Sequence, residues 1–436
     1  MEHFGRKSEL NILIDEQKIS KTQARFTLVM GRRRIGKTYL IRKSLEGQPH
    51  IYLLAMNEAE GTLCRRFQRQ IEETLGISIY GNISSMREVF DILFRHATEH
   101  HLNLVIDEVQ EFFFVRKSIF ADMQELWDKY KDQMKINMIS CGSIYSLMKE
   151  LFEDRKQAMY GRLTRRILLR PFPIQTLKEI LSHYNPQYGP KDLLCLYTLT
   201  GGVPKYVETL IDNKAYTKEA MIRCFCDTTL PFVSEGSDLM NMEFRREATV
   251  YYSLLTLIAE GHTTQGELES VLKITTSAYL RNLEENYSMI QRKRPIYASE
   301  RSQGIRYSIS DNFILSWFRF IYPNQGLVAM GRSDQLNKIL QQGYDQFVGQ
   351  MLERYFRQRA LEEEEYTEVG AWWDNKGTNE IDMVAIDSIN HRIRIAEIKM
   401  QKGKISIPLL QDKARKIQPH FKHYQVEYVA LSLEDM

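Results

Sequence analysis

One eight-residue segment constrains the fold of this chain more than any other part of the sequence. It fits the pattern G-x-x-x-x-G-K-[ST] and reads Gly31-Arg32-Arg33-Arg34-Ile35-Gly36-Lys37-Thr38. An apolar run at 26–30 precedes it and predicts a buried strand, and helical spacing follows it from Tyr39 to Leu45. A strand, a glycine-rich loop and a helix in this order predict a phosphate-binding P-loop. The alternative is an accidental glycine-rich turn.

Each residue type in this segment has a chemical reason to be there. Gly31 and Gly36 let the backbone wrap closely, so that its N–H groups can cradle phosphates. Lys37 supplies a cation to the β- and γ-phosphates, and Thr38 offers a hydroxyl to Mg²⁺. The N-terminus of the following helix adds the positive end of its dipole. We therefore expect the whole run from Gly31 to Tyr39, with Arg32, Arg33, Arg34 and Ile35, to bind ATP or ADP with Mg²⁺.

A second segment ends in two acids. The apolar run Leu102–Asp107, followed by Glu108, is typical of a central strand in a parallel sheet. Both carboxylates would lie at the C-terminal edge of the sheet, where ligands bind in open α/β folds. We expect Asp107 to hold Mg²⁺ through water, as a Walker-B acid does, and Glu108 to orient or deprotonate the attacking water. The alternative is a solvated turn.

Composition and charge exclude several classes of protein. A chain of 436 residues is long for one core and predicts several domains. No stretch approaches the ~20 apolar residues that span a membrane. Residues 1–7 contain no hydrophobic signal region, so we expect a cytoplasmic protein without a membrane partner. The five cysteines are too few and too scattered for a disulfide framework, and a net charge of +3 does not by itself imply a nucleic-acid partner.

The first half of the chain changes character near residue 170. Residues 1–170 alternate strand-like and helical patterns, which predicts a core with a parallel α/β sheet. The strands are predicted at 26–30, 51–56, 103–107, 136–140 and 167–170. Residues 171–240 look all-helical, with a break at 201–205.

Residues 241–325 have the outline of a winged helix-turn-helix. Three helical segments are predicted before two strand-like segments, at 249–260, 264–272, 276–285, 289–294 and 304–310. Arg281 on the third helix and residues 292–294 in the wing are placed to touch phosphates. Glu284 and Glu285 leave the third helix little basic charge, so the alternative is a scaffold against which the first domain packs.

The last domain, 335–436, carries a second chemical constellation. A helix around 342–360 is followed by strand-like runs at 366–372, 380–387 and 392–399, and then by the basic segment 402–422. Asp382 lies on the second run, and Glu397 and Lys399 share one face of the third. Two acids and a lysine at adjoining strand ends can hold one or two Mg²⁺ and activate a water for attack on a phosphodiester. Glu353, on the preceding helix, is a further expected metal ligand. The alternative is an exposed hairpin whose acids pair with Lys399.

Together these motifs resemble a family of prokaryotic ATPases in the STAND branch of the AAA+ class, often called archaeal-type ATPases. Their C-terminal domain, of the DUF234 type, is similar to PD-(D/E)xK nucleases. The resemblance covers nearly the whole chain. It implies that Gly31–Thr38 is Walker A and Asp107–Glu108 is Walker B. It implies an α/β multidomain fold: a P-loop AAA+ core, a helical lid over 171–240, a winged helix-turn-helix and a C-terminal α/β restriction-endonuclease-like domain.

The resemblance also assigns nucleotide-site residues that spacing alone does not. Phe4-Gly-Arg6 is similar to the adenine-side motif of the family. Ser143 ends a segment that resembles the sensor-1 strand end, near the γ-phosphate. Arg162 ends a Y-G-R element whose arginine is a candidate finger. Pro204 belongs to a segment similar to the G-x-P motif of STAND lids, where the proline lies against adenine.

In the C-terminal domain, Asp382, Glu397 and Lys399 match the nuclease-like core in order and spacing. One departure is that Ile381 stands where this core often has proline. The resemblance therefore implies a metal-dependent site that acts on DNA or RNA.

Two functions follow from these features. The first is an ATP-binding and slowly hydrolysing switch coupled to a nuclease-like effector. The alternative is an ATP-dependent regulator, or a DNA- or partner-binding protein, whose C-terminal domain does not cleave. The sequence is compatible with a homo-oligomer, because finger arginines act across subunit interfaces in AAA+ rings, whereas STAND proteins are also found as closed monomers.

Overall fold

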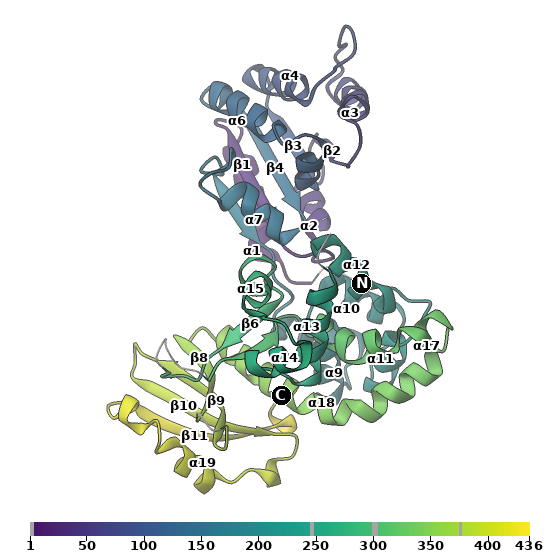
Figure 1. The fold of residues 1–436 in the computed structure, drawn as a ribbon. Helices are drawn as coiled ribbons and strands as arrows, with labels where there is room; N and C mark the ends of the chain where they lie inside the picture. Colours follow the sequence, from purple (N-terminus) through teal and green to yellow (C-terminus); the bar gives the residue numbers. More distant parts are fainter. Residues whose placement is uncertain (1–3, 245–247, 299–303, 375–376) are drawn as a thin grey trace. The chain divides into compact units, whose positions relative to one another are not determined.

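A computed structural model describes residues 4–244, 248–298, 304–374 and 377–436 (Figure 1). The chain folds as two compact units. The first comprises Gly5–Arg170, and the second comprises Phe4 together with Pro171–Met436.

The first unit is built on a five-stranded parallel sheet in the order β2-β3-β4-β1-β5. Its strands are β1 Arg25–Met30, β2 Ile51–Leu54, β3 Leu102–Asp107, β4 Ile136–Gly142 and β5 Arg165–Leu168. Every residue of β3 and β4 is buried, as expected for central strands covered on both faces. The predicted parallel α/β core is therefore confirmed.

The helices of this unit follow from local signals in the sequence. They are α1 Lys7–Ile19, α2 Lys37–Ser44, α3 Glu60–Leu75, α4 Met86–Glu99, α5 Phe112–Val115, α6 Ile119–Tyr130 and α7 Tyr145–Glu153. Helix α4 begins where the Ser85 hydroxyl accepts a hydrogen bond from the Glu88 backbone N–H. Its buried residues Val89, Phe90, Leu93 and Phe94 recur at helical spacing and form one apolar face.

The strand register gathers three loops at one edge of this sheet. Met30, the last residue of β1, pairs with Gly142 of β4, and Leu54 of β2 pairs with Asp107 of β3. The segments that follow β1, β3 and β4 therefore begin at the same edge, because parallel strands end on the same side.

The second unit opens with helices only. They are α8 Ile174–Tyr184, α9 Pro190–Thr200, α10 Pro204–Asp212, α11 Lys218–Phe225 and α12 Phe232–Phe244. Next come α13 Ala248–Glu260, α14 Gln265–Leu272, α15 Ser277–Arg281, and the hairpin of β6 Ile290–Lys293 and β7 Arg306–Ile309. The third predicted helix of this part continues past Arg281 with π-helical geometry over Asn282–Asn286.

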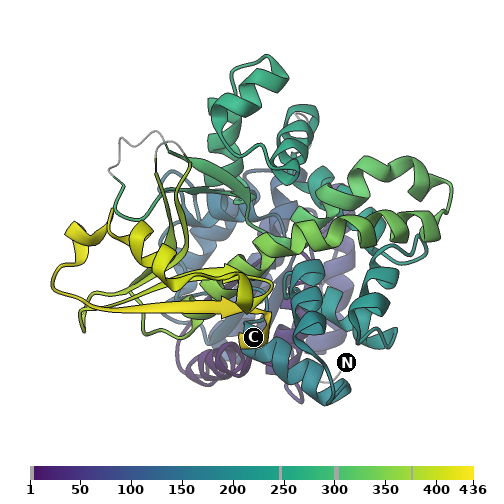
Figure 2. The same ribbon diagram turned by 90° about the horizontal axis from the view of Figure 1, so that it is seen from below.

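A long helix connects the hairpin to the last sheet. After α16 Asn312–Ser316, the π-helical turn Trp317–Ile321 and α17 Gln325–Ala329, helix α18 runs over Ser333–Glu362. It begins earlier than the prediction of 342–360. Figure 2 shows α18 in green, and it contacts α9 and α11 as well as β8, β9 and β10.

The C-terminal sheet is mixed, in the order β11-β10-β9-β8. Its strands are β8 Glu368–Trp373, β9 Glu380–Asp387, β10 Arg392–Lys399 and β11 Gln425–Ser432, with α19 Ile407–Ala414 packed on it. Only the β10–β11 pair is parallel. Strand β11 and helix α19 were not predicted from the sequence.

One continuous hydrophobic cluster runs through the second unit, from Phe172 to Leu431. It includes Trp317 and Tyr206, both fully buried, and Met351 on α18. This shared core explains why the helical part, the hairpin and the last sheet form one compact unit. The finer boundaries near 240, 325 and 335 stay predictions.

Gly202 provides a test of the turn before α10. Its φ is +74°, and a Cβ on it would lie 2.7 Å from the Phe172 carbonyl oxygen. We expect Gly202→Ala to lower the free energy of unfolding by about 2 kcal/mol or more, through backbone strain and the clash. Gly349 is the matched control, because it lies in α18 and a Cβ there would meet no atom within 4 Å. Gly349→Ala should raise stability by about 0.5–1 kcal/mol. Urea titrations of both variants, followed by circular dichroism, check this, and equal midpoints would contradict it.

Candidate functional sites

The loop after β1 has the backbone conformation of a glycine-dependent turn. Gly31, Arg34 and Gly36 have φ angles of +152°, +66° and +92°. A Cβ on Gly31 would lie 2.8 Å from the Leu169 carbonyl oxygen, so a side chain does not fit there. Gly36 is the N-cap of α2, and Ile35 is fully buried beneath the loop. The loop therefore presents backbone N–H groups at the start of a helix, which is an anion-binding arrangement.

Lys37 lies inside this loop. Its ammonium donates hydrogen bonds of 2.8 Å to the Gly31 carbonyl oxygen and 3.1 Å to that of Arg32. Burial lowers the pKa of Lys37, whereas the nearby carboxylates of Glu108 and Asp107 act to raise it. The cation is thus held between the loop and the two acids after β3.

Three side chains hold the carboxylate of Asp107. Thr38 Oγ1 and Cys141 Sγ donate to it at 3.1 and 2.8 Å, and the Tyr52 hydroxyl is hydrogen-bonded to the same oxygen as Thr38. Burial, together with the negative charge of Asp107, raises the pKa of both Tyr52 and Cys141, so both stay protonated and act as donors. Sequence reasoning found Thr38 but missed Tyr52 and Cys141, because these come from neighbouring strands and carry no motif.

Glu108 is fixed by residues from two segments. Its own backbone is left-handed, with φ of +52°. Its Oε2 atom accepts hydrogen bonds of 2.6 Å from Gln110 Nε2, 2.8 Å from Ser143 Oγ and 3.2 Å from the Ser143 N–H. Ser143, which follows β4, therefore stands beside Glu108 at the same sheet edge. Gln110 was not anticipated from the sequence.

The other residues assigned to the nucleotide site have these contacts. Arg162 pairs with Asp128 at 3.0 Å and donates to the Tyr160 carbonyl oxygen at 2.7 Å. Arg6 pairs with Glu9 at 3.0 Å and is hydrogen-bonded to the Arg170 carbonyl oxygen.

Tyr39, Phe4 and Pro204 are the remaining residues assigned to the nucleotide site, and they differ in their surroundings. The Tyr39 side chain, on α2, is 55% exposed. In the second unit, the Phe4 ring stacks edge-on against His183, and Pro204 is the first residue of α10. The roles of these residues at a nucleotide, like those of Arg6 and Arg162, stay predictions.

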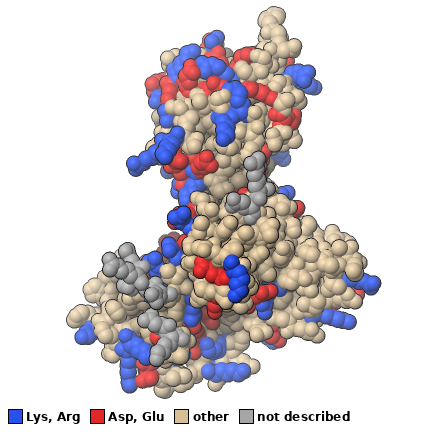
Figure 3. All heavy atoms as spheres, viewed as in Figure 1, with Lys and Arg blue, Asp and Glu red and all other residues tan. Residues whose placement is uncertain are grey.

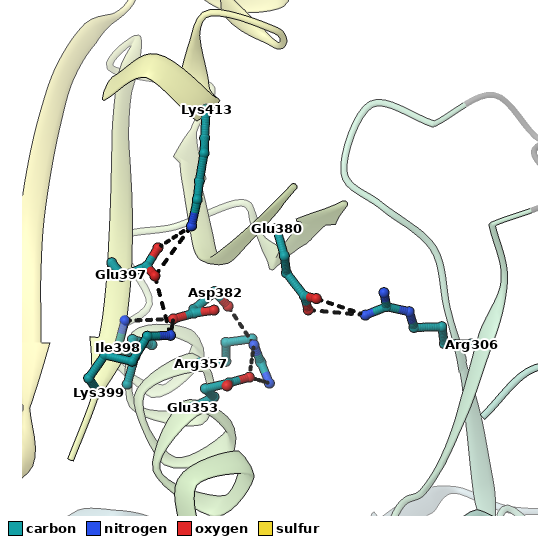
Figure 4. A network of polar contacts seen from close by, with 9 residues as sticks. All are labelled: Arg306, Glu353, Arg357, Glu380, Asp382, Glu397, Ile398, Lys399 and Lys413. Atoms are coloured by element: carbon teal, nitrogen blue, oxygen red, sulfur yellow. Dashed lines mark hydrogen bonds and ion pairs between the residues drawn. The ribbon is translucent and has the colours of Figure 1, made fainter. Parts of the chain in front are cut away.

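The C-terminal sheet brings together the second constellation (Figure 4). Asp382 on β9 accepts a hydrogen bond of 2.8 Å from the Ile398 N–H and one of 2.9 Å from Lys399 Nζ. Lys399 Nζ also lies 3.3 Å from Glu397 Oε1. Asp382 and Glu397 therefore lie on the same face of the sheet, at the ends of adjacent antiparallel strands.

Burial and charge decide the ionisation of this group. Burial raises the pKa of Asp382, although the Ile398 N–H and Lys399 oppose this shift. Burial acts to lower the pKa of Lys399, but the hydrogen bond to Asp382 and the charge of Glu397 outweigh it, so this pKa is raised. Lys399 is therefore a cation at neutral pH.

Two residues around the constellation add to it. Glu353 on α18 pairs with Arg357 at 3.3 Å, and burial raises the pKa of Glu353 to about 7. Arg357 is also hydrogen-bonded to the Asp382 carbonyl oxygen, which ties α18 to β9. Lys413 on α19 lies 3.1 Å from Glu397, and it belongs to the predicted basic segment. Lys413 and Arg357 were not singled out from the sequence.

Two further findings concern the described part of the chain as a whole. There, no three His, Cys, Asp or Glu side chains gather in a metal-holding arrangement, and no helix is both long and apolar enough to cross a membrane.

On the face of the first unit seen in Figure 3, Lys and Arg are interspersed with Asp and Glu. That face therefore shows no continuous basic surface.

The parallel sheet, the glycine-rich loop after β1 and the acid pair after β3 define a P-loop ATPase domain. Residues 3–210 match the family described as an ATPase domain predominantly from Archaea. Residues 317–417 match DUF234, a family of archaeal and bacterial proteins of unknown function. The chain thus combines an archaeal-type ATPase domain with a C-terminal DUF234 domain.

Known proteins are similar to this chain along most of its length. An uncharacterized protein of Methanocaldococcus jannaschii is 28% identical over 411 residues, covering 90% of this chain and 86% of that protein. The Walker-type ATPase of Pyrococcus abyssi superposes with a TM-score of 0.53 at 20% identity, over 73% of this chain and 96% of that chain. The ORC2 protein of Aeropyrum pernix gives a TM-score of 0.45 at 13% identity, over 74% of this chain and 94% of that chain. The likeness to the Pyrococcus ATPase shows a shared fold.

The ammonium of Lys37 is the group to test for nucleotide binding. We expect Lys37→Ala to remove a charge-assisted phosphate contact of about 1.5–3 kcal/mol and to weaken ATP binding roughly ten- to hundredfold. Lys43→Ala is the control, because Lys43 lies on the same helix and pairs with Glu46 at the surface. Isothermal titration calorimetry measures both affinities. Equal affinity of Lys37→Ala and the parent protein for ATP would show that the loop after β1 is not the ATP-binding site.

Proposed function

We propose that this protein is a STAND-type molecular switch in which ATP binding and slow hydrolysis control a nuclease-like effector acting on nucleic acid. The observation that carries the proposal is the presence of two separate carboxylate sites in one chain. Asp107 and Glu108 face Lys37 and Thr38 in the first unit, and Asp382 and Glu397 share Lys399 in the second.

At the ATPase site, different residues bind the phosphates, hold Mg²⁺ and activate the water. The loop N–H groups and Lys37 bind the phosphates, and Thr38 and Asp107 would hold Mg²⁺. When bound, Mg²⁺ offsets negative charge on the transferring phosphoryl group. Glu108 is held by Ser143 and Gln110, so its carboxylate is oriented to align a water and accept its proton. In the hydrolysis step, the water oxygen bonds to the γ-phosphorus while the bond to the ADP oxygen breaks.

The C-terminal site has the groups that phosphodiester hydrolysis needs. Asp382 and Glu397 offer the carboxylate oxygens that Mg²⁺ or Mn²⁺ prefers. Glu353, the predicted third ligand, pairs with Arg357 and does not gather with these two acids into a metal-holding group in the described structure. A bound ion would stabilise charge on the phosphate and activate water. Because Lys399 stays a cation, it would contact the scissile phosphate and not act as a base. In this step, the water oxygen bonds to phosphorus while the bond to the ester oxygen breaks. The water gives up a proton to solvent, and the leaving ester oxygen takes one from solvent.

A second function is favoured by a specific observation. Lys399 and Lys413 already pair with Asp382 and Glu397, which offsets the charge that would attract a metal ion. An ATP-dependent regulator whose C-terminal domain binds nucleic acid or a partner without cleavage would keep such ion pairs. The two functions differ in one measurable property, which is metal-dependent cleavage.

Glu108→Gln tests hydrolysis separately from binding. The amide keeps the shape of the side chain but cannot accept a proton, so we expect turnover to fall by about 10²-fold or more while ATP affinity persists. Glu99→Gln, a change on the exposed end of α4, is the control and should keep full turnover. Phosphate release measures turnover, and calorimetry measures ATP affinity. Loss of ATP binding together with turnover would mean that Glu108 has a structural role.

Asp382→Asn tests the nuclease-like site in the full-length protein. We expect Mg²⁺- or Mn²⁺-dependent cleavage of DNA or RNA by the parent protein, and at least about a 10²-fold loss in the variant, since its amide is a poorer metal ligand. Binding of the same strands, measured by fluorescence anisotropy, should be kept. Asp345→Asn is the control, because Asp345 is an exposed residue of α18. Binding by the parent without cleavage of single-stranded DNA, double-stranded DNA or RNA would support the second function instead.

A further inference from the structure

The second unit contains a cavity of about 590 Å³ that the functions above do not use, apart from Glu353 on its wall. Its walls come from the β6–β7 hairpin, helix α18 and strands β8 and β9. The charged side chains that line it are Arg292, Lys293, Arg294, Arg306, Arg354, Arg357, Glu353, Glu368 and Glu380. Six basic side chains thus line the cavity against three acids. Arg292 is also paired with Glu284, 3.4 Å away, so the remaining excess of basic groups lies around Lys293.

Lys293 is the centre of this excess charge. It pairs in register with Arg306 on the opposite strand of the hairpin, which puts two cations side by side. Arg306 is compensated, because Glu380 lies 3.1 Å away and the Trp373 ring lies beneath its guanidinium at 4.4 Å. Within residues 4–244, 248–298, 304–374 and 377–436, the Lys293 side chain has neither a hydrogen bond nor an ion pair. A lysine ammonium that lies among other cations in a cavity, with no partner of its own, costs free energy unless a ligand binds it.

The cations around Lys293 are fixed by other contacts. Arg354 donates to Asn312 Oδ1 at 2.7 Å and to the Ile309 carbonyl oxygen at 2.8 Å. Arg357 is held by Glu353 at 3.3 Å. Burial and these two guanidinium groups lower the pKa of Lys293, and Glu353 and Glu380 offset this only in part. The positive charge next to Lys293 therefore comes in part from two guanidinium groups, of Arg354 and Arg357, that are held in place by their own contacts.

We propose that this cavity binds a phosphate ester of nucleotide size, with its phosphate on Lys293. A doubly charged phosphate matches converging cations better than a carboxylate does. A volume of about 590 Å³ exceeds what a lone phosphate needs and is within the range of small-molecule sites. Tyr307 and Trp373 line the same cavity, but both rings are largely buried and Arg306 covers one face of Trp373, so the volume and the basic groups carry the proposal. The ligand is either a free nucleotide or the phosphorylated end of a nucleic-acid strand.

The site goes beyond the proposed function and stands without it. Glu353 and Arg357 belong both to the cavity and to the surroundings of Asp382, so a ligand on Lys293 would lie next to the nuclease-like constellation (Figure 4). Binding at Lys293 itself requires neither ATP hydrolysis nor a metal ion. It can therefore be measured in EDTA, where neither ATP hydrolysis nor nucleic-acid cleavage can proceed.

The experiment uses full-length protein carrying Lys37→Ala, so that the P-loop contributes little. AMP, a 5′-phosphorylated thymidine dinucleotide and adenosine are titrated in EDTA and followed by calorimetry. We expect the two phosphate esters to bind and adenosine not to bind. Adding Lys293→Gln should weaken binding at least about tenfold, because a charge-assisted contact is lost. Lys293→Arg should retain most of the affinity. Lys338→Gln, at an exposed position of α18 outside the cavity, should leave it unchanged.

The titration results distinguish a free nucleotide from the end of a nucleic-acid strand as the ligand, and they can overturn the proposal. Tighter binding of AMP than of the dinucleotide identifies a free nucleotide, and the reverse identifies the end of a strand. In the absence of ligand, Lys293→Gln should also raise the midpoint of urea unfolding, because it removes an amine whose charged form burial and two guanidinium groups disfavour in the folded state. The proposal fails if no phosphate ester binds, if Lys293→Gln binds as tightly as its parent, if its unfolding midpoint falls, or if only duplex DNA responds to Lys293. Asp382→Asn should keep this binding, so loss of cleavage alone leaves the cavity proposal intact.

Discussion

A buried carboxylate must be surrounded by donors, and the chain meets this constraint in two opposite ways. Asp107, only 5% exposed at the end of β3, is held by the hydroxyls of Thr38 and Tyr52 and by the thiol of Cys141. These donors are neutral, so they stabilise the carboxylate without cancelling its charge. Asp382, equally buried, is held instead by the Lys399 ammonium and one backbone N–H. The first acid keeps its charge for an incoming cation, whereas the charge of the second is already offset.

This contrast bears on how each site would respond to its ligand. At the ATPase site, the acids and Lys37 already form a charge pattern that matches Mg²⁺ and phosphates, so binding needs little rearrangement. At the C-terminal site, a cation must compete with Lys399 and Lys413 for the two carboxylates. A phosphate that draws these lysines away would free the carboxylates at the same time. If the C-terminal domain acts as proposed, metal and nucleic acid are therefore expected to bind this site cooperatively.

The sequence predicted those features whose signals are local. The P-loop, the acids after β3 and the period-two pattern of β9 and β10 each lie within one short segment. Tyr52 and Cys141 could not be found this way, because parallel pairing alone brings their strands to Asp107. Gln110 lies only two residues after Glu108, but it belongs to no motif. Strand β11 was missed because its first residues are exposed and its burial follows no alternation. Helix α19 was hidden in a segment dominated by basic residues, where charge masked its buried Leu410 and Ala414.

Helix α18 shows how one element can serve several sites. Glu353, Arg354 and Arg357 occupy positions i, i+1 and i+4, so the first and last share a face while Arg354 points elsewhere. That face meets β9 through Arg357 and Asp382, and Arg354 reaches Asn312 and the end of β7. The same helix packs into the core that it shares with α9 and α11. A shift of α18 would therefore move Glu353 and Arg357 against Asp382 and change the cavity around Lys293 in the same step. Because well-packed helices move as rigid bodies, α18 is the element through which the helical part of this unit could act on the C-terminal sheet.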